Sequence, residues 1–272
     1  MYADLHIHSN FSDSTNSPED IVRIAVERNV SLISICDHMN FDSYDRLKEA
    51  CNLNGISFIA GIELDANLND ENYHVLVYNF DRNNKRFNDF VNSHKDKSKK
   101  ECEAMIERMS LDFPELSLSE YISYEYPTEQ GGWKYMHYII EKGLHKTHSG
   151  VGEDFFPKYF VAGEETFSVE DFCVVAKQAG GIPVLAHPGN LETETLIFLL
   201  KNMKERGIEG VECYYPSHNK NTTETCLNYC KYNNLRITSG SDCHGEYDKT
   251  PGFSMGSMKT TIDMLDLKGI DL

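Results

Sequence analysis

The chain has 272 residues and a formal net charge of −17, with 26 Lys and Arg against 43 Asp and Glu. That length can bury a large core, and the acidic balance argues against a broad surface for duplex DNA, which needs basic patches. None of the eight cysteines forms a Cys-x-x-Cys pair, no signal-peptide pattern opens the chain, and no apolar run reaches the ~18 residues of a membrane span, so we expect reduced thiols and a cytoplasmic protein without a membrane segment.

Apolar runs alternate with helical patterns along most of the chain. The runs predict strands at residues 2–7, 31–36, 56–62, 74–80, 182–186, 210–214 and 235–239. Helices are predicted after Ser17, which is followed by Pro18 and two acidic residues, and at 44–54, 169–178, 192–205 and 222–233. Strands that alternate with helices favour parallel pairing, so we expect an α/β fold with a barrel-like sheet of seven strands.

The alternation stops between residues 83 and 167. This stretch is charged and rich in helical patterns, and it contains no clear strand. We interpret it as a helical insertion in one loop of the barrel, which is then formed by residues 1–82 and 168–272. A basic run at 95–100 within the insertion is interpreted as a solvated helix face.

Side chains of the kind that bind metals cluster where the predicted strands end. His6 and His8 lie two residues apart, and so do Asp242 and His244; alternate residues of a strand point to the same face. Imidazole and carboxylate together suit Zn, Mn or Fe. The other candidates at strand ends, or in the loops that follow them, are Asp13, His38, Glu63 and His187. The sequence therefore predicts a metal site at the carboxyl ends of the strands.

Two further residues are interpreted from their positions. His74 opens its predicted strand instead of closing it, so by position alone it is typical of an ordinary strand histidine. Asp4 shares the predicted face of His6 and His8, and we interpret it as a buried carboxylate that orients a histidine.

Residues of the insertion supply candidate substrate contacts. Lys134 and His137 are three apart on one predicted helix face, where they either meet a phosphate or form an exposed polar face. Trp133 either stacks on a base or is a core aromatic of the insertion. The remaining histidines of this region are interpreted as surface residues: His94, His145 and His148.

These blocks together resemble the polymerase and histidinol phosphatase (PHP) metal-dependent phosphoesterases. The motifs that carry the resemblance are Asp4-Leu5-His6-Ile7-His8-Ser9 with Ser12-Asp13, Asp37-His38, Gly61-Ile62-Glu63, His74, His187-Pro188-Gly189 and Gly240-Ser241-Asp242-Cys243-His244. Within the family, the chain is most similar to the branch of nucleoside 3′,5′-bisphosphate phosphatases and short-RNA 5′-exonucleases, whose members carry a helical insertion before the His-Pro-Gly block. The resemblance implies a distorted seven-stranded (β/α)7 barrel, an insertion that caps the active site, and three divalent metal ions (Mn, Fe or Zn).

The resemblance also implies how the ligands are shared. The first ion is implied at His6, His8, Glu63 and Asp242, the second at Glu63, His74 and His187, and the third at Asp13, His38 and His244. His74 is thereby implied to be a ligand despite its position. The branch usually carries an Arg where Lys134 stands, and Lys binds phosphate as a point charge instead of through two parallel hydrogen bonds.

The expected reaction is hydrolysis of a phosphomonoester by a hydroxide that bridges two metals, with Glu63 as the bridging carboxylate. Lys134, His137 and His218 are expected to contact phosphate, and His218 is also a candidate to protonate the leaving oxygen. The expected substrates are nucleotides, as 3′,5′-bisphosphates or 5′-phosphates, or short 5′-phosphorylated RNA. The alternatives are a phosphatase of a non-nucleotide metabolite such as histidinol phosphate, an amide-hydrolysing enzyme, and a non-catalytic module. No particular oligomeric state is predicted.

Overall fold

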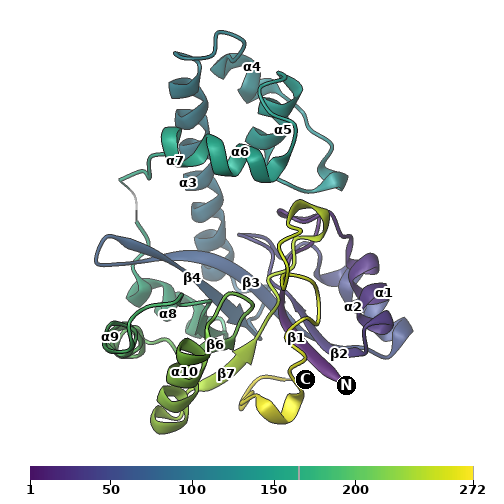
Figure 1. The fold of residues 1–272 in the computed structure, drawn as a ribbon, viewed down its shortest axis with the longest axis vertical. Helices are drawn as coiled ribbons and strands as arrows, with labels where there is room; N and C mark the ends of the chain where they lie inside the picture. Colours follow the sequence, from purple (N-terminus) through teal and green to yellow (C-terminus); the bar gives the residue numbers. More distant parts are fainter. Residues whose placement is uncertain (165, 272) are drawn as a thin grey trace.

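The computed structural model describes residues 1–164 and 166–271 (Figure 1). One seven-stranded sheet has its strands in chain order: β1 (Tyr2–Ile7), β2 (Val30–Ile35), β3 (Ser57–Leu68), β4 (Glu71–Tyr78), β5 (Ile182–Leu185), β6 (Gly210–Tyr214) and β7 (Arg236–Ser239). Neighbours are parallel, except that β4 is antiparallel to both β3 and β5. A parallel bridge between Ile7 and Cys243 joins the two edges. The predicted seven-stranded α/β barrel is therefore confirmed.

The parallel pairing expected for the strands is wrong for β4. A two-residue turn joins β3 to β4, and its residues, Asn69 and Asp70, have positive φ values of 54° and 67°. Asn and Asp tolerate this left-handed region better than most side chains, and such a turn makes the two strands run in opposite directions. The amino end of β4 therefore lies beside the carboxyl end of β3, with His74 opposite Asp65.

Helices cover the outside of the barrel (Figure 1). They are α1 (Pro18–Glu27), α2 (Tyr44–Asn54), α8 (Val169–Gln178), α9 (Thr193–Glu205) and α10 (Lys220–Asn233). The first of them begins as the sequence predicts, because the Ser17 side chain accepts a hydrogen bond from the Asp20 backbone N–H and Pro18 occupies the first turn. Its apolar side, which includes Ile21 and Ala25, packs into a core shared with α2 and the first two strands.

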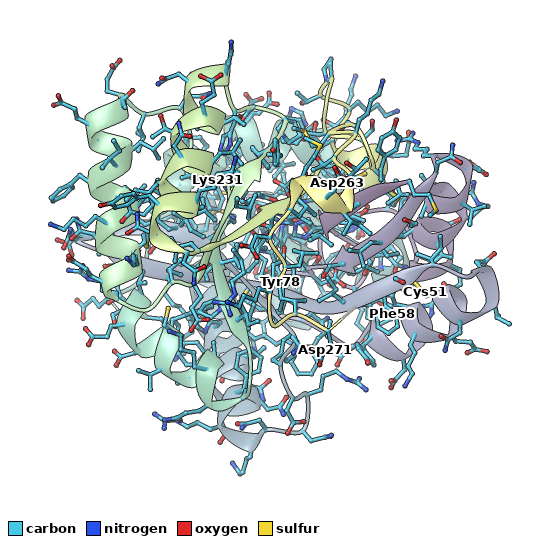
Figure 2. The ribbon with its side chains drawn as sticks, turned by 90° about the horizontal axis from the view of Figure 1, so that it is seen from below. Cys51, Phe58, Tyr78, Lys231, Asp263 and Asp271 are labelled. Carbon is cyan, nitrogen blue, oxygen red and sulfur yellow. The ribbon has the colours of Figure 1, made fainter. Side chains whose placement is uncertain are left out.

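The inside of the barrel is apolar over much of its height. Tyr78, the last residue of β4, is fully buried, and it lies near the centre of the molecule seen from below (Figure 2). Its hydroxyl donates a hydrogen bond to the Leu5 carbonyl at 2.8 Å. The same cluster contains Ala3, Leu5, Leu32, Cys36, Ile59, Leu76, Ile182, Val184, Ala186 and Ile270. Apolar packing here keeps water away from the underside of the polar residues at the rim.

A helical subdomain, which we call the cap, lies above the barrel (Figure 1). Its elements are α3 (Lys85–Met109), α4 (Leu118–Ser123), the 3-10 turn η1 (Thr128–Gln130), α5 (Lys134–Glu141), α6 (His148–Asp154) and α7 (Phe156–Tyr159). The helical insertion is confirmed, although α3 belongs to both parts. Phe87 and Val91 pack into the barrel core, whereas Met105 and Ile106 join a separate core within the cap. The domain boundaries at 83 and 167 stay predictions.

The C-terminal segment folds back along the barrel and includes the 3-10 turns η2 (Gly245–Tyr247) and η3 (Ile262–Met264). An antiparallel bridge between Tyr2 and Thr261 brings it to β1, so the two ends of the chain lie near one another (Figure 1). In the part of the chain that the structure describes, no helix is both long enough and apolar enough to cross a membrane.

Candidate metal centre

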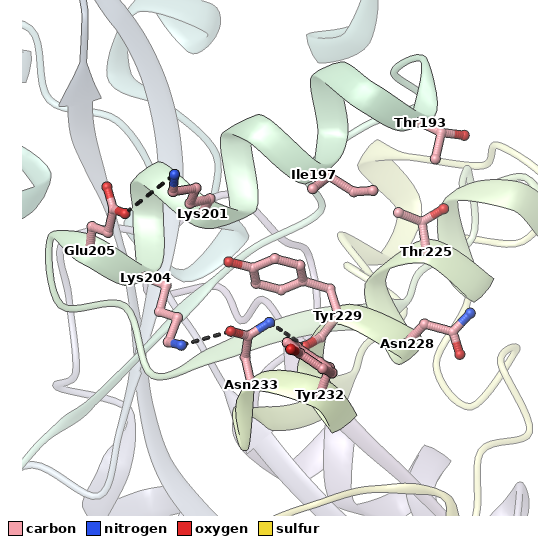
Figure 3. Close-up of a pocket in the computed structure, with 10 residues that line it drawn as sticks. All are labelled: Thr193, Ile197, Lys201, Lys204, Glu205, Thr225, Asn228, Tyr229, Tyr232 and Asn233. Atoms are coloured by element: carbon pink, nitrogen blue, oxygen red, sulfur yellow. Dashed lines mark hydrogen bonds and ion pairs between the residues drawn. The ribbon is translucent and has the colours of Figure 1, made fainter.

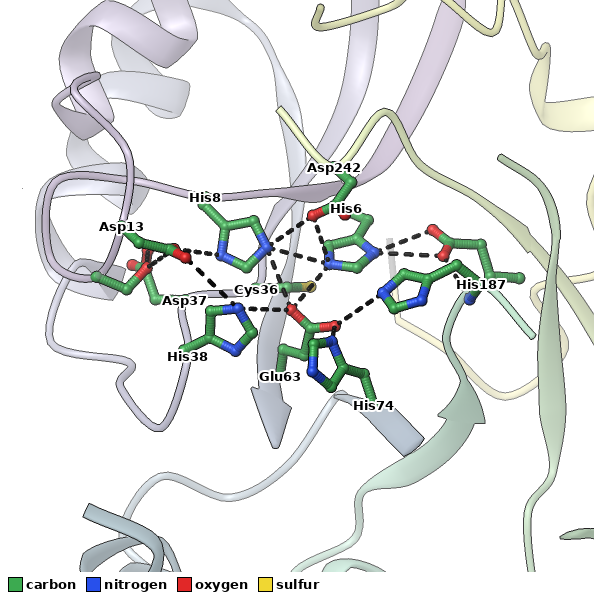
Figure 4. A network of polar contacts seen from close by, with 12 residues as sticks. His6, His8, Asp13, Cys36, Asp37, His38, Glu63, His74, His187 and Asp242 are labelled. Atoms are coloured by element: carbon green, nitrogen blue, oxygen red, sulfur yellow. Dashed lines mark hydrogen bonds and ion pairs between the residues drawn. The ribbon is translucent and has the colours of Figure 1, made fainter. Parts of the chain in front are cut away.

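The nine predicted ligands lie together at one end of the barrel, and all of them except His244 are labelled in Figure 4. They come from the carboxyl ends of the parallel strands, from the loops that follow, and from the amino end of β4. Because β4 is antiparallel to its neighbours, its first residues reach the same rim as the last residues of β3 and β5. The reversal of this strand explains why His74, in the amino-terminal half of β4, belongs to the cluster.

The Glu63 carboxylate lies at the centre of the cluster (Figure 4). Its Oε2 is 3.1 Å from His6 Nε2 and 3.2 Å from His8 Nε2. Its Oε1 is 2.9 Å from His74 Nδ1 and 3.3 Å from His187 Nε2. Oε2 is also 3.4 Å from His38 Nε2, so the two oxygens face different sets of imidazoles, an arrangement suited to a carboxylate shared by two cations.

A second group of ligands forms around Asp13. Its Oδ1 is 3.3 Å from His8 Nδ1, and its Oδ2 is 3.3 Å from His244 Nε2 and 3.7 Å from His38 Nε2. The rings of His8 and His244 stack with their centroids 4.2 Å apart. His8 links the two groups, because its Nε2 faces Glu63 while its Nδ1 faces Asp13.

The donor atoms lie close enough together to hold metal ions. Ligand atoms within 4.8 Å of one another form four overlapping groups: His8, Asp13, His38 and His244; His6, His8, Glu63 and Asp242; His6, His187 and Glu212; and His38, Glu63 and His74. Despite their near neighbours, His8 Nδ1 and Glu63 Oε1 are buried without a hydrogen bond of acceptable geometry. Buried polar atoms are normally paired, and separate cations, one beside His8 Nδ1 and one beside Glu63 Oε1, would satisfy them.

Burial and opposite charges compete in setting the pKa values of the ligands. Burial lowers the pKa of His6, but the negative charges of Glu63 and Glu212 outweigh it and raise that pKa well above its usual range. Burial likewise opposes protonation of His8, yet Asp13 and its neighbours raise the pKa of His8 to about 10. Burial alone would raise the pKa of Glu63, and the surrounding imidazoles hold it well below its usual range. Cation binding must therefore displace protons from this network.

Glu212 of β6 is a buried carboxylate that the sequence analysis did not select. Its Oε1 accepts a hydrogen bond from His6 Nδ1 at 3.1 Å, and its Oε2 accepts one from the His187 backbone N–H at 3.0 Å. Gly240 leaves room for this contact, because a Cβ there would overlap the His6 side chain and lie 2.6 Å from Glu212 Oε1. An acidic residue inside an apolar strand was the available signal. By orienting His6, Glu212 tunes the site without being one of the nine predicted ligands.

Asp37 is a second orienting carboxylate. Its Oδ1 accepts hydrogen bonds from the Ser9 backbone N–H and the Ser12 hydroxyl, both at 2.7 Å, and its Oδ2 accepts one from the Ser9 hydroxyl at 2.6 Å. These bonds fix the loop after β1 that carries Asp13. Asp37 thus fixes the loop that carries Asp13, while the neighbouring His38 faces the cluster.

The orienting role predicted for Asp4 is wrong. Its carboxylate accepts hydrogen bonds from the backbone N–H groups of Ser241 and Gly256 at 2.9 and 2.7 Å, so it ties the C-terminal loops to β1. The pairing of β1 with β2 is irregular between Asp4 and Ile7. Strict alternation of faces fails at such an irregularity, so sharing a face with His6 could not be inferred from spacing.

Two ligands have unusual backbone conformations. Asp242 has φ 53° and His187 has φ 20°, which non-glycine residues rarely adopt. Such conformations cost on the order of 1–3 kcal/mol each and are typical of functional sites. The Tyr215 hydroxyl donates a hydrogen bond to Asp242 Oδ2 at 2.8 Å and so helps to hold the carboxylate toward the cluster.

Lys134 and His137 do not share one exposed helix face. Lys134 Nζ donates a hydrogen bond to the Ile122 carbonyl at 3.0 Å and lies 5.0 Å from the centre of the Tyr121 ring. His137 is buried, and its Nε2 donates to the Gly131 carbonyl at 2.7 Å. Phosphate contact by either residue stays a prediction, and His137 would have to give up this bond to make one.

His218 lies beside the cluster but outside the nine ligands. Its Nδ1 donates a hydrogen bond to the Cys213 carbonyl at 3.3 Å, and its Nε2 is buried without a partner among the described residues. Its ring centre is 5.3 Å from that of Tyr215, which in turn is 4.8 Å from that of His187. Burial lowers the pKa of His218, so the neutral ring carries its proton on Nδ1 and offers a lone pair at Nε2.

The surface position predicted for His94 is wrong. This residue is buried, and its two ring nitrogens face the carbonyls of Asp65 and Phe90 at 2.9 and 3.0 Å. His148 is also partly covered, with its Nε2 3.3 Å from His137 Nε2. Packing of α3 against β3 and Phe167 buries His94, and packing within the cap covers His148. A histidine without a neighbouring carboxylate in the sequence gives no sign of this burial.

Three cavities border the cluster, and each has Trp133 in its wall. Their volumes are about 410, 240 and 330 Å³. The Trp133 ring centre is 5.8 Å from that of His38, so this side chain stands between the cap and the ligands. A larger cavity of about 680 Å³ lies between α9 and α10, where Tyr229 is one of its walls (Figure 3). None of the nine ligands lines it.

The comparison with known families gives one match, in which residues 4–124 fit the PHP domain. The chain therefore carries a PHP domain, and it is a metal-dependent phosphoesterase. It is 25% identical over 260 residues to a 5′-3′ exoribonuclease of Haemophilus influenzae, covering 89% of each chain. It is 24% identical to a phosphoribosyl 1,2-cyclic phosphate 1,2-diphosphodiesterase of Eggerthella lenta, covering 92% of this chain and 97% of the relative.

A third PHP relative is a 3′,5′-nucleoside bisphosphate phosphatase of Chromobacterium violaceum, with 24% identity over 89% of this chain and 86% of the relative. Among solved structures, a Bifidobacterium adolescentis protein thought to be a metal-dependent phosphoesterase superposes with a TM-score of 0.82. The match covers 97% of this chain and 94% of that protein at 24% identity, which supports the fold. The family and the enzyme class inferred from the motifs are confirmed.

Proposed function

We propose that this PHP protein hydrolyses phosphomonoesters of nucleotides, or of short 5′-phosphorylated RNA, at a centre of three divalent metal ions. The observation that carries the proposal is the convergence of the nine predicted ligands at one end of the barrel, with Glu63 at their centre and its two oxygens facing different imidazoles. The names of two relatives, an exoribonuclease and a bisphosphate phosphatase, support a nucleotide substrate.

The contacts suggest how the ligands are divided. The first set is His6, His8, Glu63 and Asp242; the second is Glu63, His74 and His187; the third is Asp13, His38 and His244, with His8 alongside. Imidazole with carboxylate fits Mn, Fe or Zn. Such ions, when bound, lower the pKa of water from about 15.7 to about 7 and neutralise phosphoryl charge. A side-chain nucleophile is then unnecessary.

The protein's own side chains position this chemistry. Glu63 holds its two oxygens toward different sets of imidazoles, and Glu212 fixes the orientation of His6. The free lone pair of His218 Nε2 suits it to accept a hydrogen bond from water or from a substrate hydroxyl. If His218 protonates the leaving oxygen, it must first gain a proton, because burial lowers its pKa.

The cap supplies the groups that would recognise a nucleotide. Trp133 presents an aromatic surface beside His38, where a base attached to the reacting phosphate could stack. Lys134 lines a cavity that reaches His38, so it is better placed than His137 to meet a second phosphate.

A substrate panel tests the proposal. Purified protein supplied with Mn would be offered adenosine 3′,5′-bisphosphate, adenosine 5′-monophosphate, a short 5′-phosphorylated RNA and histidinol phosphate, and release of phosphate or nucleotide would be measured. The same protein treated with EDTA is the control. Preference for the bisphosphate or the RNA is the expected result. Preference for histidinol phosphate would keep the metal centre and reject a nucleotide-binding cap, whereas no turnover in metal-containing protein would reject the proposed reaction.

A cyclic ribose phosphate belongs in the same panel as the second candidate. One relative of nearly equal length is a phosphoribosyl 1,2-cyclic phosphate 1,2-diphosphodiesterase at 24% identity. Faster turnover of that diester than of any nucleotide would favour this alternative.

A further inference from the structure

One of the three cavities beside the cluster is basic. The cavity of about 240 Å³ reaches His38 and is lined by Lys95, Lys99 and Lys134. Among its described lining residues there is no Asp or Glu. In a chain with 43 acidic and 26 basic residues, a cavity lined by three lysines and no carboxylate is unusual. We call it the basic groove.

The other two cavities are acidic by comparison. The cavity of about 410 Å³ is lined by Asp13, Glu153 and Asp248, with no Lys or Arg among its described lining residues. The cavity of about 330 Å³ has Lys97, but that ammonium group is 2.8 Å from the Glu101 carboxylate and is thereby neutralised. A strand of linked phosphates would be repelled by the first and attracted little by the second, so the basic groove is its favoured path away from the cluster.

The lysines of the basic groove carry free charge. Lys95 and Lys99 are four apart on α3 and therefore lie on one helix face. Lys99 is 4.0 Å from its nearest carboxylate, Glu103, and the described residues show no ion pair for Lys95 or Lys134. The run at 95–100 is thus more than a solvated face, because part of it borders a cavity that opens on the ligands.

Aromatic rings alternate with these lysines around the groove. Tyr126 and Trp133 are partly exposed, and Tyr121 lies under the Lys134 ammonium group. Trp133 joins the groove to the cluster through its contact with His38. Lysines that follow a phosphate backbone and aromatic rings on which bases stack are the two elements of single-strand binding sites.

We propose that the basic groove holds the linking phosphates and bases that follow the first nucleotide of a short single-stranded nucleic acid, while its 5′ phosphate lies at the cluster. This inference rests on the proposed function, and it commits the protein to oligonucleotides as better substrates than mononucleotides. Lys95 and Lys99 act as positioning residues for the strand and take no part in the hydrolytic step.

The test compares a double variant, Lys95→Gln with Lys99→Gln, against Lys100→Gln. Lys100 is an exposed lysine of the same helix that lies outside the groove lining, so it controls for the loss of a positive charge from α3 that leaves the groove unchanged. The substrates are adenosine 5′-monophosphate and 5′-phosphorylated di- and tetranucleotides. Two readouts are taken: kcat/KM with Mn, and fluorescence anisotropy of a 3′-labelled tetranucleotide with EDTA-treated protein, which reports binding without turnover.

The double variant is expected to lower kcat/KM for the tetranucleotide about tenfold and that for the monophosphate less than about twofold, and to reduce the log–log salt slope of strand binding by about 1.4. Lys100→Gln should match the wild type. Equal losses for both substrates, or equal losses in both variants, would overturn the groove assignment. Strand binding that depends on Lys95 and Lys99 without any nucleotide turnover would instead support the groove and reject the proposed function.

Discussion

The nine predicted ligands and the side chains that hold them, which we call the ligand layer, differ from the cap in side-chain type and burial. In the ligand layer, imidazoles and carboxylates near strand ends are wholly or partly buried and held by neighbours such as Glu212 and Asp37. In the cap, long or flat side chains such as Lys99 and Trp133 line open cavities from helices with a separate core. This difference is what the proposed function requires: a barrel that determines the reaction and a cap that determines the substrate. Changes in the first should abolish chemistry, and changes in the second should alter preference.

The largest effect is expected from Glu63→Gln, which preserves shape but removes the bridging charge. Turnover should fall at least about a thousandfold, because metal-derived charge stabilisation contributes several kcal/mol, and metal content should fall with it. Phosphate release and elemental analysis would be measured together. Glu224→Gln, on exposed α10 beside Lys220, is the control and should leave both unchanged. Wild-type turnover in Glu63→Gln would remove the basis for the ligand layer.

A smaller but still large effect is expected from Gly240→Ala. The added methyl group must overlap His6, so the strand end or the ligand has to move, at a cost of about 1–3 kcal/mol. Metal affinity should fall about 10–100-fold, as when an orienting contact is lost. Gly152→Ala in α6, where the nearest atom to the new methyl is 3.7 Å away, is the matched control. Normal metal binding by Gly240→Ala would show that the layer is less rigid than described.

The pH dependence of stability should differ between metal-free and metal-loaded protein. The folded-state pKa of His8 is about 10, raised from 6.5, so its protonation stabilises the metal-free fold below about pH 6.5, and this contribution is lost as the pH rises toward 10. Bound metal requires neutral imidazoles, so the metal-loaded protein should gain stability over the same interval. Thermal unfolding with EDTA or Mn, from about pH 6 to 8.5, checks the two opposite slopes. Parallel slopes would contradict the protonated network.

The smallest effect is expected from Lys134→Gln assayed on a mononucleotide. Its Nζ already contacts the Ile122 carbonyl, and partly exposed charges contribute about 1 kcal/mol or less, so kcat/KM should fall less than about fivefold. Lys134→Arg, which restores the charge, should recover most of the loss. A hundredfold loss would place this residue with the ligand layer and blur the division between the two regions.

The motifs at strand ends located most of the nine predicted ligands in the sequence. Spacing of two residues identified the pairs His6–His8 and Asp242–His244, and the family resemblance added His74. Contacts between distant segments were not readable in this way. Glu212 contacts His6, which lies 206 positions away in the sequence. The Asp4 carboxylate contacts backbone groups of the C-terminal loops, because the pairing of β1 is irregular after Asp4.

The reversal of β4 was missed because the sequence analysis ended the preceding strand at Ile62, whereas β3 continues to Leu68. Its last residues alternate polar Asp65 and Asn67 with buried Ala66 and Leu68, which is a strand pattern. The cap was less predictable still. Its helices were expected, but which lysines of the 95–100 run face a cavity depends on how α3 packs against α5.

The direction of β4 has a consequence for how this scaffold can change. The chain leaves β4 at the end of the barrel away from the ligands, and α3, with 25 residues and a length of roughly 38 Å, carries it back up (Figure 1). The N-terminal part of α3 packs in the barrel core, and its C-terminal part packs in the separate core of the cap. The part of the cap that follows His94 along α3 contains no strand of the sheet, so its replacement as a unit leaves the strand pairing unchanged. A different cap would then give a different substrate specificity, while the barrel keeps the same candidate metal centre.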